Sequence, residues 1–135
     1  MLEDFYFDTS IWLDFHEKRG RNGELAFKLI IKIINEGLKI AYSDLNIKEF
    51  KHLGYTNDNI NSIFSISKPD NIKRIHIYRE QADEAKKLSR QREVPKKDAL
   101  HAILCRDNNL HLISRDQHFE KLKDVIIAKK PEDFI

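Results

Sequence analysis

The sequence predicts a mixed α/β fold with a largely parallel sheet covered on both faces. Short apolar runs, typical of buried strands, alternate along the chain with longer segments in which apolar residues recur at helical spacing. This order is typical of parallel strands connected by helices that pack on the two faces of the sheet. The composition agrees, since 41% of the residues are hydrophobic and 34% are charged, as in globular proteins.

The first half of the chain contains two predicted strands and four predicted helices. The aromatic run at residues 5–7 predicts a buried strand, and the capping residues at 8–10 predict the start of a helix that Gly20 ends. The other elements of this half are a helix over residues 22–35, a strand over 38–42, a helix over 45–53 and a short helix over 57–66.

The second half follows a turn at residues 69–71. The segment 97–106 is apolar around most of its circumference, so we expect a central, buried helix there. The other predicted elements are strands at residues 72–77, 110–113 and 125–127, a polar helix ending at residue 92, a short helix over 118–122 and an end segment over 131–135.

Length and charge exclude several classes of protein. A chain of 135 residues has the size of one domain, so we expect residues 1–135 to form a single domain. The net charge of +2 gives no overall attraction to nucleic acid or to anionic membranes. The only cysteine, Cys105, excludes an internal disulfide and suits a cytoplasmic protein. The most apolar stretch, residues 29–34, is too short to span a membrane.

Four carboxylates occupy positions that favour a shared site. Asp8 and Asp116 each follow a predicted strand, and ligands of open α/β sheets bind at that end of the strands. Asp98 lies in the first turn of the most apolar helix, and Glu49 shares a helix face with Leu45. Each acid alone also has an ordinary interpretation as a helix cap, a partner of the helix dipole, a turn former or a solvated side chain.

Four carboxylates brought together would repel one another and would need protons, cations or a metal. Their hard oxygen atoms suit Mg²⁺ or Mn²⁺. Such a site can activate a water and stabilise the charge that develops when a phosphodiester is hydrolysed. The nearby cations Lys97 and Arg115 are candidates for contacts with substrate phosphates, although both could be ordinary exposed cations.

Four segments of the chain contain the acids in a recurring order: residues 5–10 with Asp8, 43–50 with Glu49, 98–102 with Asp98, and 112–119 with Asp116. Together these segments resemble the PIN domain, the nuclease domain of VapC-type toxins and related ribonucleases. The resemblance runs from residue 5 to about residue 127, and Ser114 stands where the family more often has threonine.

The resemblance implies a three-layer α/β/α fold with a central, mostly parallel sheet. It also implies a Mg²⁺- or Mn²⁺-dependent endoribonuclease, a homodimer, and an antitoxin protein that blocks the site. The role that we expect from it is the toxin of a type II toxin–antitoxin system. Its implied residue roles are metal binding by Asp8, Asp98 and Asp116, a second metal or an oriented water at Glu49, and support of the acids or the substrate phosphate by Ser10 and Ser114.

Two other functions stay open at this point. A PIN-like nuclease of RNA processing would use the same site. A catalytically silent α/β binding module would use its acids only as helix caps.

The sequence also predicts the surroundings of four further side chains. Asp44 is expected to cap a helix rather than join the acids, and Asp14 is expected to be solvated. His101 is expected to be a buried or near-site histidine. His118 is expected at the surface, with a position near the mouth of the site as the alternative. The histidines show no zinc-binding spacing.

Overall fold

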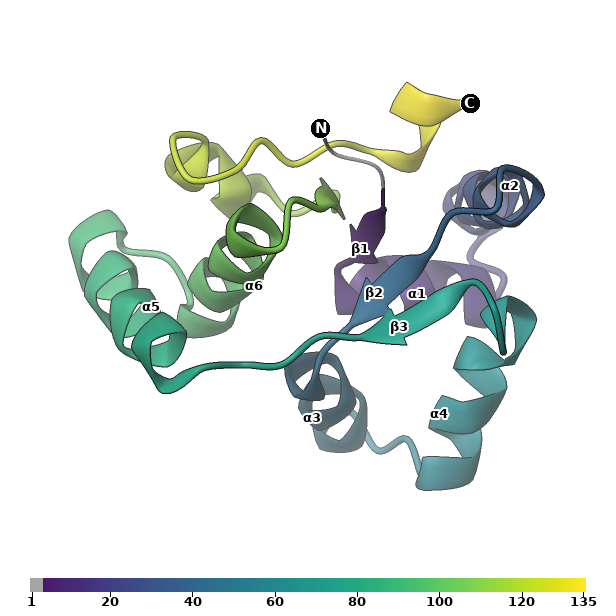
Figure 1. Cartoon of the computed structure of the whole chain (residues 1–135), viewed down its shortest axis with the longest axis horizontal. Coiled ribbons are helices and arrows are strands. Elements are labelled where there is room, and N and C mark those ends of the chain that lie inside the picture. The colour runs from purple at the N-terminus through teal and green to yellow at the C-terminus, as the bar shows by residue number, and fades with distance from the viewer. Residues whose placement is uncertain (1–3) are drawn as a thin grey trace.

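The computed structural model describes residues 4–135 as a parallel sheet with helices on both faces (Figure 1). The strands are β1 (Phe5–Phe7), β2 (Ile40–Tyr42), β3 (Ile72–Arg74) and β4 (His111–Ile113). The α-helices are α1 (Thr9–His16), α2 (Gly20–Asn35), α3 (Asp44–His52), α4 (Asn57–Phe64), α5 (Arg79–Arg92) and α6 (Lys96–Asp107), and the 3₁₀ segments are η1 (Ser65–Ser67), η2 (Gln117–Leu122) and η3 (Pro131–Phe134). The predicted α/β/α fold is confirmed, while the predicted single domain includes residues 1–3, which lie outside the described residues.

The strands lie in the order β3-β2-β1-β4, and every pairing is parallel. β1 is therefore central, with Phe5 opposite Ile40 on one side and His111 on the other. The chain builds one half of the sheet outward from β1 and then crosses over to place β4 on the opposite side. Open α/β sheets bind ligands at the carboxyl ends of the strands where the order reverses in this way.

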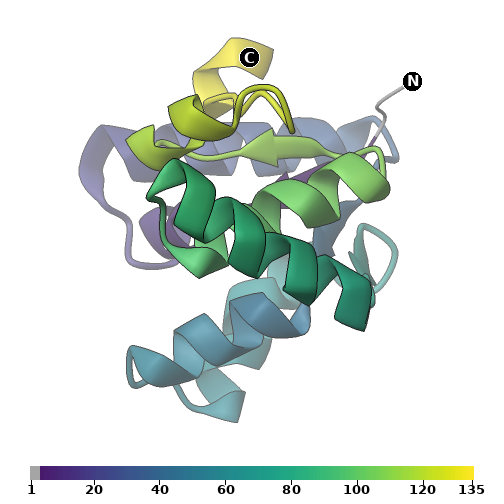
Figure 2. The same ribbon diagram turned by 90° about the vertical axis from the view of Figure 1, so that its left-hand side faces the viewer.

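β1 is buried on both sides, and its side chains alternate between two cores. Phe5 and Phe7 pack in the core that α1, α2 and α4 form with the sheet. Tyr6 points the other way, into the core formed by α5 and α6. Figure 2 views the molecule from the side of α5 and α6, which lie next to each other in front of the strands.

The connection between α1 and α2 lies earlier in the chain than expected. α1 ends at His16 instead of continuing to Arg19, and α2 begins at Gly20 instead of Asn22. The turn between them contains left-handed backbone at Lys18 (φ 51°) and at Gly20 (φ 57°), where glycine carries no steric penalty. Gly20 therefore begins the second helix and does not end the first, which has already stopped at His16.

The predicted strand at residues 125–127 is wrong. The amides of Val125 and Ile126 both donate to the carbonyl of Leu122, which makes this segment a turn after η2. Pairing with β4 comes later, as a single parallel bridge between Ile113 and Lys129. Apolar residues alone indicated a strand here, but the turn uses the amides that a longer ladder would need.

The predicted strand at residues 72–77 is shorter than expected, since β3 ends at Arg74. The apolar face of α4 is buried, including Ile60, Ile63 and Phe64, so these residues pack inside the protein and expose no patch. Within residues 4–135, no helix has both the length and the apolar character needed to cross a membrane.

Candidate metal and phosphodiester site

Asp8 lies where β1 ends and α1 begins, and it is buried. It occupies the N-cap position, yet its side chain makes no capping hydrogen bond. Its Oδ2 instead accepts a hydrogen bond of 2.8 Å from the Ser114 hydroxyl, beyond the end of β4. The helix-cap interpretation therefore does not account for this carboxylate, which faces the neighbouring strand end.

Glu49 comes from α3 and is fixed by two donors on one oxygen. Its Oε1 accepts a hydrogen bond of 2.5 Å from Thr9 Oγ1 and lies 2.8 Å from His101 Nε2. Burial is the largest single influence on the pKa of Glu49 and raises it. The hydrogen bonds from His101 and Thr9 and the positive charges of His101 and Lys97 together outweigh burial, so this pKa lies below its ordinary value. Among the described residues Oε2 has no hydrogen-bond partner, so one oxygen of a charged carboxylate is left for a ligand.

A buried chain of hydrogen bonds extends behind Glu49. His101 Nδ1 lies 2.7 Å from the Tyr6 hydroxyl, which lies 2.9 Å from Ser43 Oγ. Because an ionised carboxylate only accepts, Nε2 of His101 carries the proton that faces Glu49. Burial raises the pKa of Tyr6 well above its ordinary value, so this hydroxyl keeps its proton and donates within the chain.

Asn46 ties the same region to the backbone. Its Nδ2 donates to Thr9 Oγ1 (3.1 Å) and to the carbonyl of Phe7 (3.3 Å), and its Oδ1 accepts from the amide of Ser43 (3.0 Å). Ser43 and Asn46 also form the capping box at the start of α3. The cap of one helix thus holds the hydroxyl that orients Glu49.

Asp98 is almost fully buried in the first turn of α6. Burial, followed by the charges of Asp116 and Asp8, raises the pKa of Asp98 to about 6. Its Oδ2 lies 3.0 Å from His118 Nδ1. Nearby carboxylates therefore disfavour ionisation of this group, which is the condition that a bound cation relieves.

Asp116 follows β4 and is the N-cap of η2. Its Oδ1 accepts the amide hydrogen of His118 at 2.9 Å, so here the turn-former interpretation is part of the structure. Ser114 Oγ accepts from the Asp116 amide (3.0 Å) while donating to Asp8, and so links two of the acids. This contact agrees with the supporting position expected for Ser114.

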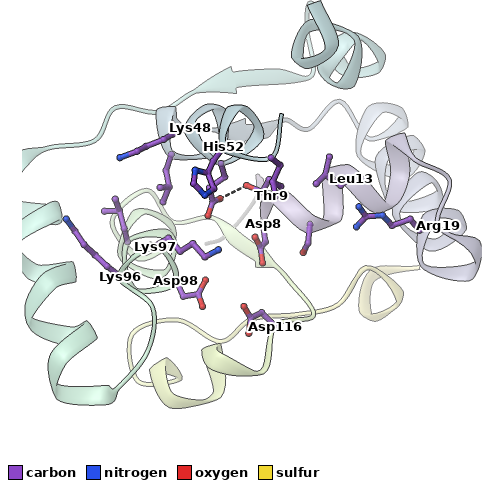
Figure 3. A pocket seen from close by; sticks show the side chains of 15 residues that line it. Asp8, Thr9, Leu13, Arg19, Lys48, His52, Lys96, Lys97, Asp98 and Asp116 are labelled. Carbon is purple, nitrogen blue, oxygen red and sulfur yellow. Dashed lines mark hydrogen bonds between the residues drawn. The ribbon is translucent and has the colours of Figure 1, made fainter. Parts of the chain in front are cut away.

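All four predicted acids line one pocket of about 750 Å³. Figure 3 shows the carboxylates of Asp8, Asp98 and Asp116 turned toward a common space, with the side chain of Lys97 extending toward them. The possible metal-ligand atoms of the four acids and of two histidines form two groups, and the atoms of each group lie within 4.8 Å of one another. We call these the inner cluster (Asp8, Glu49 and His101) and the outer cluster (Asp98, Asp116 and His118).

Basic side chains surround the acids. Lys48, Lys96 and Lys97 line the pocket, and in the described part of the chain none of the three has an ion-pair partner. The positive charge of Lys97 also acts on Glu49. These amines surround an acidic centre with groups suited to an anionic ligand.

Two other predicted residues are placed less directly. Ser10 lines the pocket but is exposed, and no hydrogen bond within residues 4–135 ties it to the acids. The adjacent Thr9 makes that contact instead. Arg115 forms a bidentate pair with Glu132, at 2.8 and 2.9 Å, and does not line the pocket that holds the acids.

The fold also tests the expectations for three other side chains. His118 is exposed, as expected, and its ring also contacts two of the acids. Asp14 was expected to be solvated but is buried beside Arg19, and burial raises its pKa. Asp44 is the first residue of α3 and pairs with Arg74, while Ser43 provides the cap.

Some of these contacts had a signal in the sequence. His101 is three residues after Asp98, so the two share a helix face. Tyr6 alternates with Phe5 and Phe7, which places it on the face covered by α6. No local pattern distinguishes Thr9 from Ser10 as the partner of Glu49.

The side chains fit a hard divalent cation. Asp8, Glu49, Asp98 and Asp116 offer carboxylate oxygens, the donors that Mg²⁺ and Mn²⁺ prefer. The free Oε2 of Glu49 and the raised pKa of Asp98 both indicate negative charge that the protein alone does not neutralise.

Structural comparison finds similar folds among solved structures, including the following three, all with low sequence identity to this chain. A chain of VapBC2 from Rickettsia felis, bound to a DNA fragment from the promoter, has a TM-score of 0.69 and 14% identity, with 93% of this chain and 97% of that chain covered. A chain of a toxin–antitoxin complex from Klebsiella pneumoniae has a TM-score of 0.64 and 18% identity, with 95% and 98% covered. PAE2754 from Pyrobaculum aerophilum has a TM-score of 0.60 and 18% identity, with 99% and 95% covered.

A comparison with curated proteins finds no match. Comparison with protein families matches residues 5–125 to the PIN domain, a segment that contains all four acids and every strand of the sheet. The chain therefore belongs to the PIN domain family.

Proposed function

We propose that the protein is a Mg²⁺- or Mn²⁺-dependent endoribonuclease that hydrolyses phosphodiester bonds in RNA. The observation that carries this proposal is the convergence of four carboxylates, from sequence positions 8 to 116, on one pocket lined by lysines. A pocket with acidic donors at its centre and amines around them suits a metal together with a phosphate backbone. Membership of the PIN domain family supports the same activity.

In this proposal Asp8, Asp98 and Asp116 hold the cation, directly or through water. Ser114 keeps Asp8 and Asp116 in place by donating to one and accepting from the backbone of the other. A bound divalent cation would supply a water of lowered pKa and would neutralise charge on the phosphate.

Glu49 orients the attacking water through its free Oε2, while Thr9 and His101 hold the other oxygen. Its lowered pKa keeps this carboxylate charged and able to accept a hydrogen bond from that water. The water oxygen forms a bond to phosphorus as the bond to the leaving ribose oxygen breaks. Glu49 could equally hold a second cation, in which case Oε2 is the ligand atom.

Lys97 is the proposed contact for a substrate phosphate, because it lines the pocket and its charge acts on Glu49. Ser10, exposed at the same pocket, is placed to reach the substrate rather than the acids. Arg115 would reach a phosphate only after leaving Glu132, so we assign it a smaller role.

We further propose that the protein is the toxin of a type II toxin–antitoxin pair, with an antitoxin protein as its partner and with two copies forming a homodimer. The described fold covers nearly the whole of chains from VapBC2 and from a toxin–antitoxin complex. A toxin that cleaves cellular RNA would act in the cytoplasm. A PIN-like nuclease of RNA processing would use the same site.

Incubation of the purified protein with total tRNA and rRNA tests the activity. Cleavage is expected with Mg²⁺ or Mn²⁺, should stop in EDTA and should return when Mn²⁺ is added. Asp8→Asn should abolish cleavage and leave the circular dichroism spectrum unchanged. Asp58→Asn, an exposed carboxylate in the first turn of α4, is the matched control and should cleave normally.

Unimpaired cleavage by Asp8→Asn, or full turnover in chelator, would refute the proposal. Absence of cleavage on every RNA together with absence of Mn²⁺ binding would favour the silent binding module instead.

A further inference from the structure

The half-exposed ring of His118 makes a contact that a surface histidine does not need. Its Nδ1 lies 3.0 Å from Asp98 Oδ2 and also 3.0 Å from Asp116 Oδ1. Its backbone amide is bound to the same Asp116 oxygen, which holds the residue at this position. The ring nitrogen is therefore directed at the gap between two carboxylates.

One nitrogen cannot satisfy both acids by hydrogen bonding. Nδ1 carries at most one hydrogen, and the hydrogen-bonded partner is Asp98. Asp116 Oδ1 is equally close but accepts only the backbone amide of His118. Three potential ligand atoms thus meet around one point, and only one of the three pairs among them is a side-chain hydrogen bond.

The spacing is that of neighbouring ligands around a small cation. Donor atoms about 2.1 Å from a metal and at right angles to each other are about 3.0 Å apart. Both distances from Nδ1 to the carboxylate oxygens have this value. Neutral imidazole is a metal ligand through either ring nitrogen.

We propose that His118 is itself a ligand of the divalent cation, with Asp98 and Asp116, and that its imidazole makes the site prefer Mn²⁺ over Mg²⁺. The inference rests on the proposed function only for the presence of a cation at these acids.

The preference follows from ligand chemistry. Mg²⁺ favours oxygen donors and retains its waters, whereas transition ions accept imidazole nitrogen readily. Mn²⁺ also accepts carboxylates, so a site with two carboxylates and one imidazole suits it better than it suits Mg²⁺.

The two other histidines near the pocket do not offer a ring nitrogen to the outer cluster. Both ring nitrogens of His101 already have partners, Glu49 and Tyr6. His52 lines the pocket but belongs to neither ligand cluster, which makes it the matched control.

Mn²⁺ binding to the metal-free protein tests the inference without RNA. Electron spin echo spectroscopy of bound Mn²⁺ detects a coordinated imidazole through its ¹⁴N coupling. The wild type and His52→Ala should both show the coupling, and His118→Ala should lack it. Titration should show Mn²⁺ bound at least about tenfold more weakly by His118→Ala, with little change for Mg²⁺.

A second variant, His118→Asp, replaces the imidazole with a carboxylate and should shift the ratio of the two affinities toward Mg²⁺. Circular dichroism should show that all three variants are folded, since His118 and His52 are both exposed.

Bound Mn²⁺ without ¹⁴N coupling in the wild type would overturn the inference, and so would coupling that survives in His118→Ala. Neither result would touch the proposed nuclease activity, which the RNA assay decides separately. Conversely, the coupling would stand even if no RNA were cleaved, and it would then identify a metal-binding protein of another function.

Discussion

The two clusters of the pocket are held in different ways. In the inner cluster, Glu49 is fixed by a hydroxyl and an imidazole that are themselves hydrogen-bonded, and its pKa is lowered. In the outer cluster, Asp98 and Asp116 share one imidazole, and the pKa of Asp98 is raised to about 6. The fold therefore holds Glu49 in place and keeps it charged, whereas Asp98 in the outer cluster keeps a charge conflict that a cation would remove.

Asp98→Asn should have the largest effect, because it removes a ligand from the cluster that depends on the cation. We expect RNA cleavage to fall by about 10³-fold or more, as when several kcal/mol of charge stabilisation are lost. The metal-free variant should be more stable than the wild type at pH 7, by about 1–2 kcal/mol after allowance for solvent screening.

The pH dependence of this effect has a definite sign. The folded-state pKa of Asp98 lies above its ordinary value of 3.8. The free energy that protonation of Asp98 contributes to folding is therefore fully present below pH 3.8. It is lost as the pH rises through about 6. Urea denaturation in EDTA should show the wild type losing stability across this range relative to Asp98→Asn. If the stabilities of the two proteins changed with pH in parallel, Asp98 would not carry the proposed charge conflict.

Thr9→Val tests the inner cluster and should have the next largest effect. It removes the hydroxyl that binds Glu49 and Asn46 while keeping the shape of the side chain. We expect a loss of about 10–100-fold in kcat with little change in KM, since the carboxylate stays but is no longer fixed. Thr9→Ser keeps the hydroxyl and should restore most of the rate. A loss that appears only in KM would mean that Thr9 binds substrate instead.

Lys97→Ala concerns neither cluster directly and should weaken RNA binding. We expect a higher KM on RNA of any sequence and a salt dependence of binding reduced by about one unit in slope. Lys73→Ala, whose amine pairs with Asp4 away from the pocket, is the control and should bind RNA normally. An unchanged salt slope in Lys97→Ala would remove this lysine from the binding surface.

Asp44→Asn should have the smallest effect. Asp44 is exposed and pairs with Arg74 at the start of α3, and exposed pairs contribute about 0–1 kcal/mol. Cleavage should remain at the wild-type rate, measured on the same RNA. A loss comparable to that of Asp98→Asn would make Asp44 a fifth acid of the site.

The sequence predicted the positions of the acids well because those positions follow from local rules. Asp8 and Asp116 are next to strands, and Asp98 is in the first turn of an apolar helix, so the parallel sheet brings them to one edge. The strand at residues 125–127 was wrong because a hydrogen-bonded turn, and not apolar content, decides that segment.

The contacts between the acids and their partners were harder to predict. Thr9 reaches Glu49 only because Asn46, from another element, holds its hydroxyl. The ring of His118 faces the acids because of the first turn of η2, which no periodic pattern in the sequence marks. Such contacts join residues far apart along the chain and depend on tertiary packing.

The pairing of Asp8 with Ser114 has a consequence for the timing of synthesis. β1 is made first, but its partner β4 and the residues that follow it come more than one hundred positions later. A nascent chain that stops short of residue 111 lacks both β4, the strand on one side of β1, and Asp116, one of the four acids. If the protein cleaves RNA, the nascent chain is therefore inactive toward the RNA of its own ribosome until translation has passed residue 116.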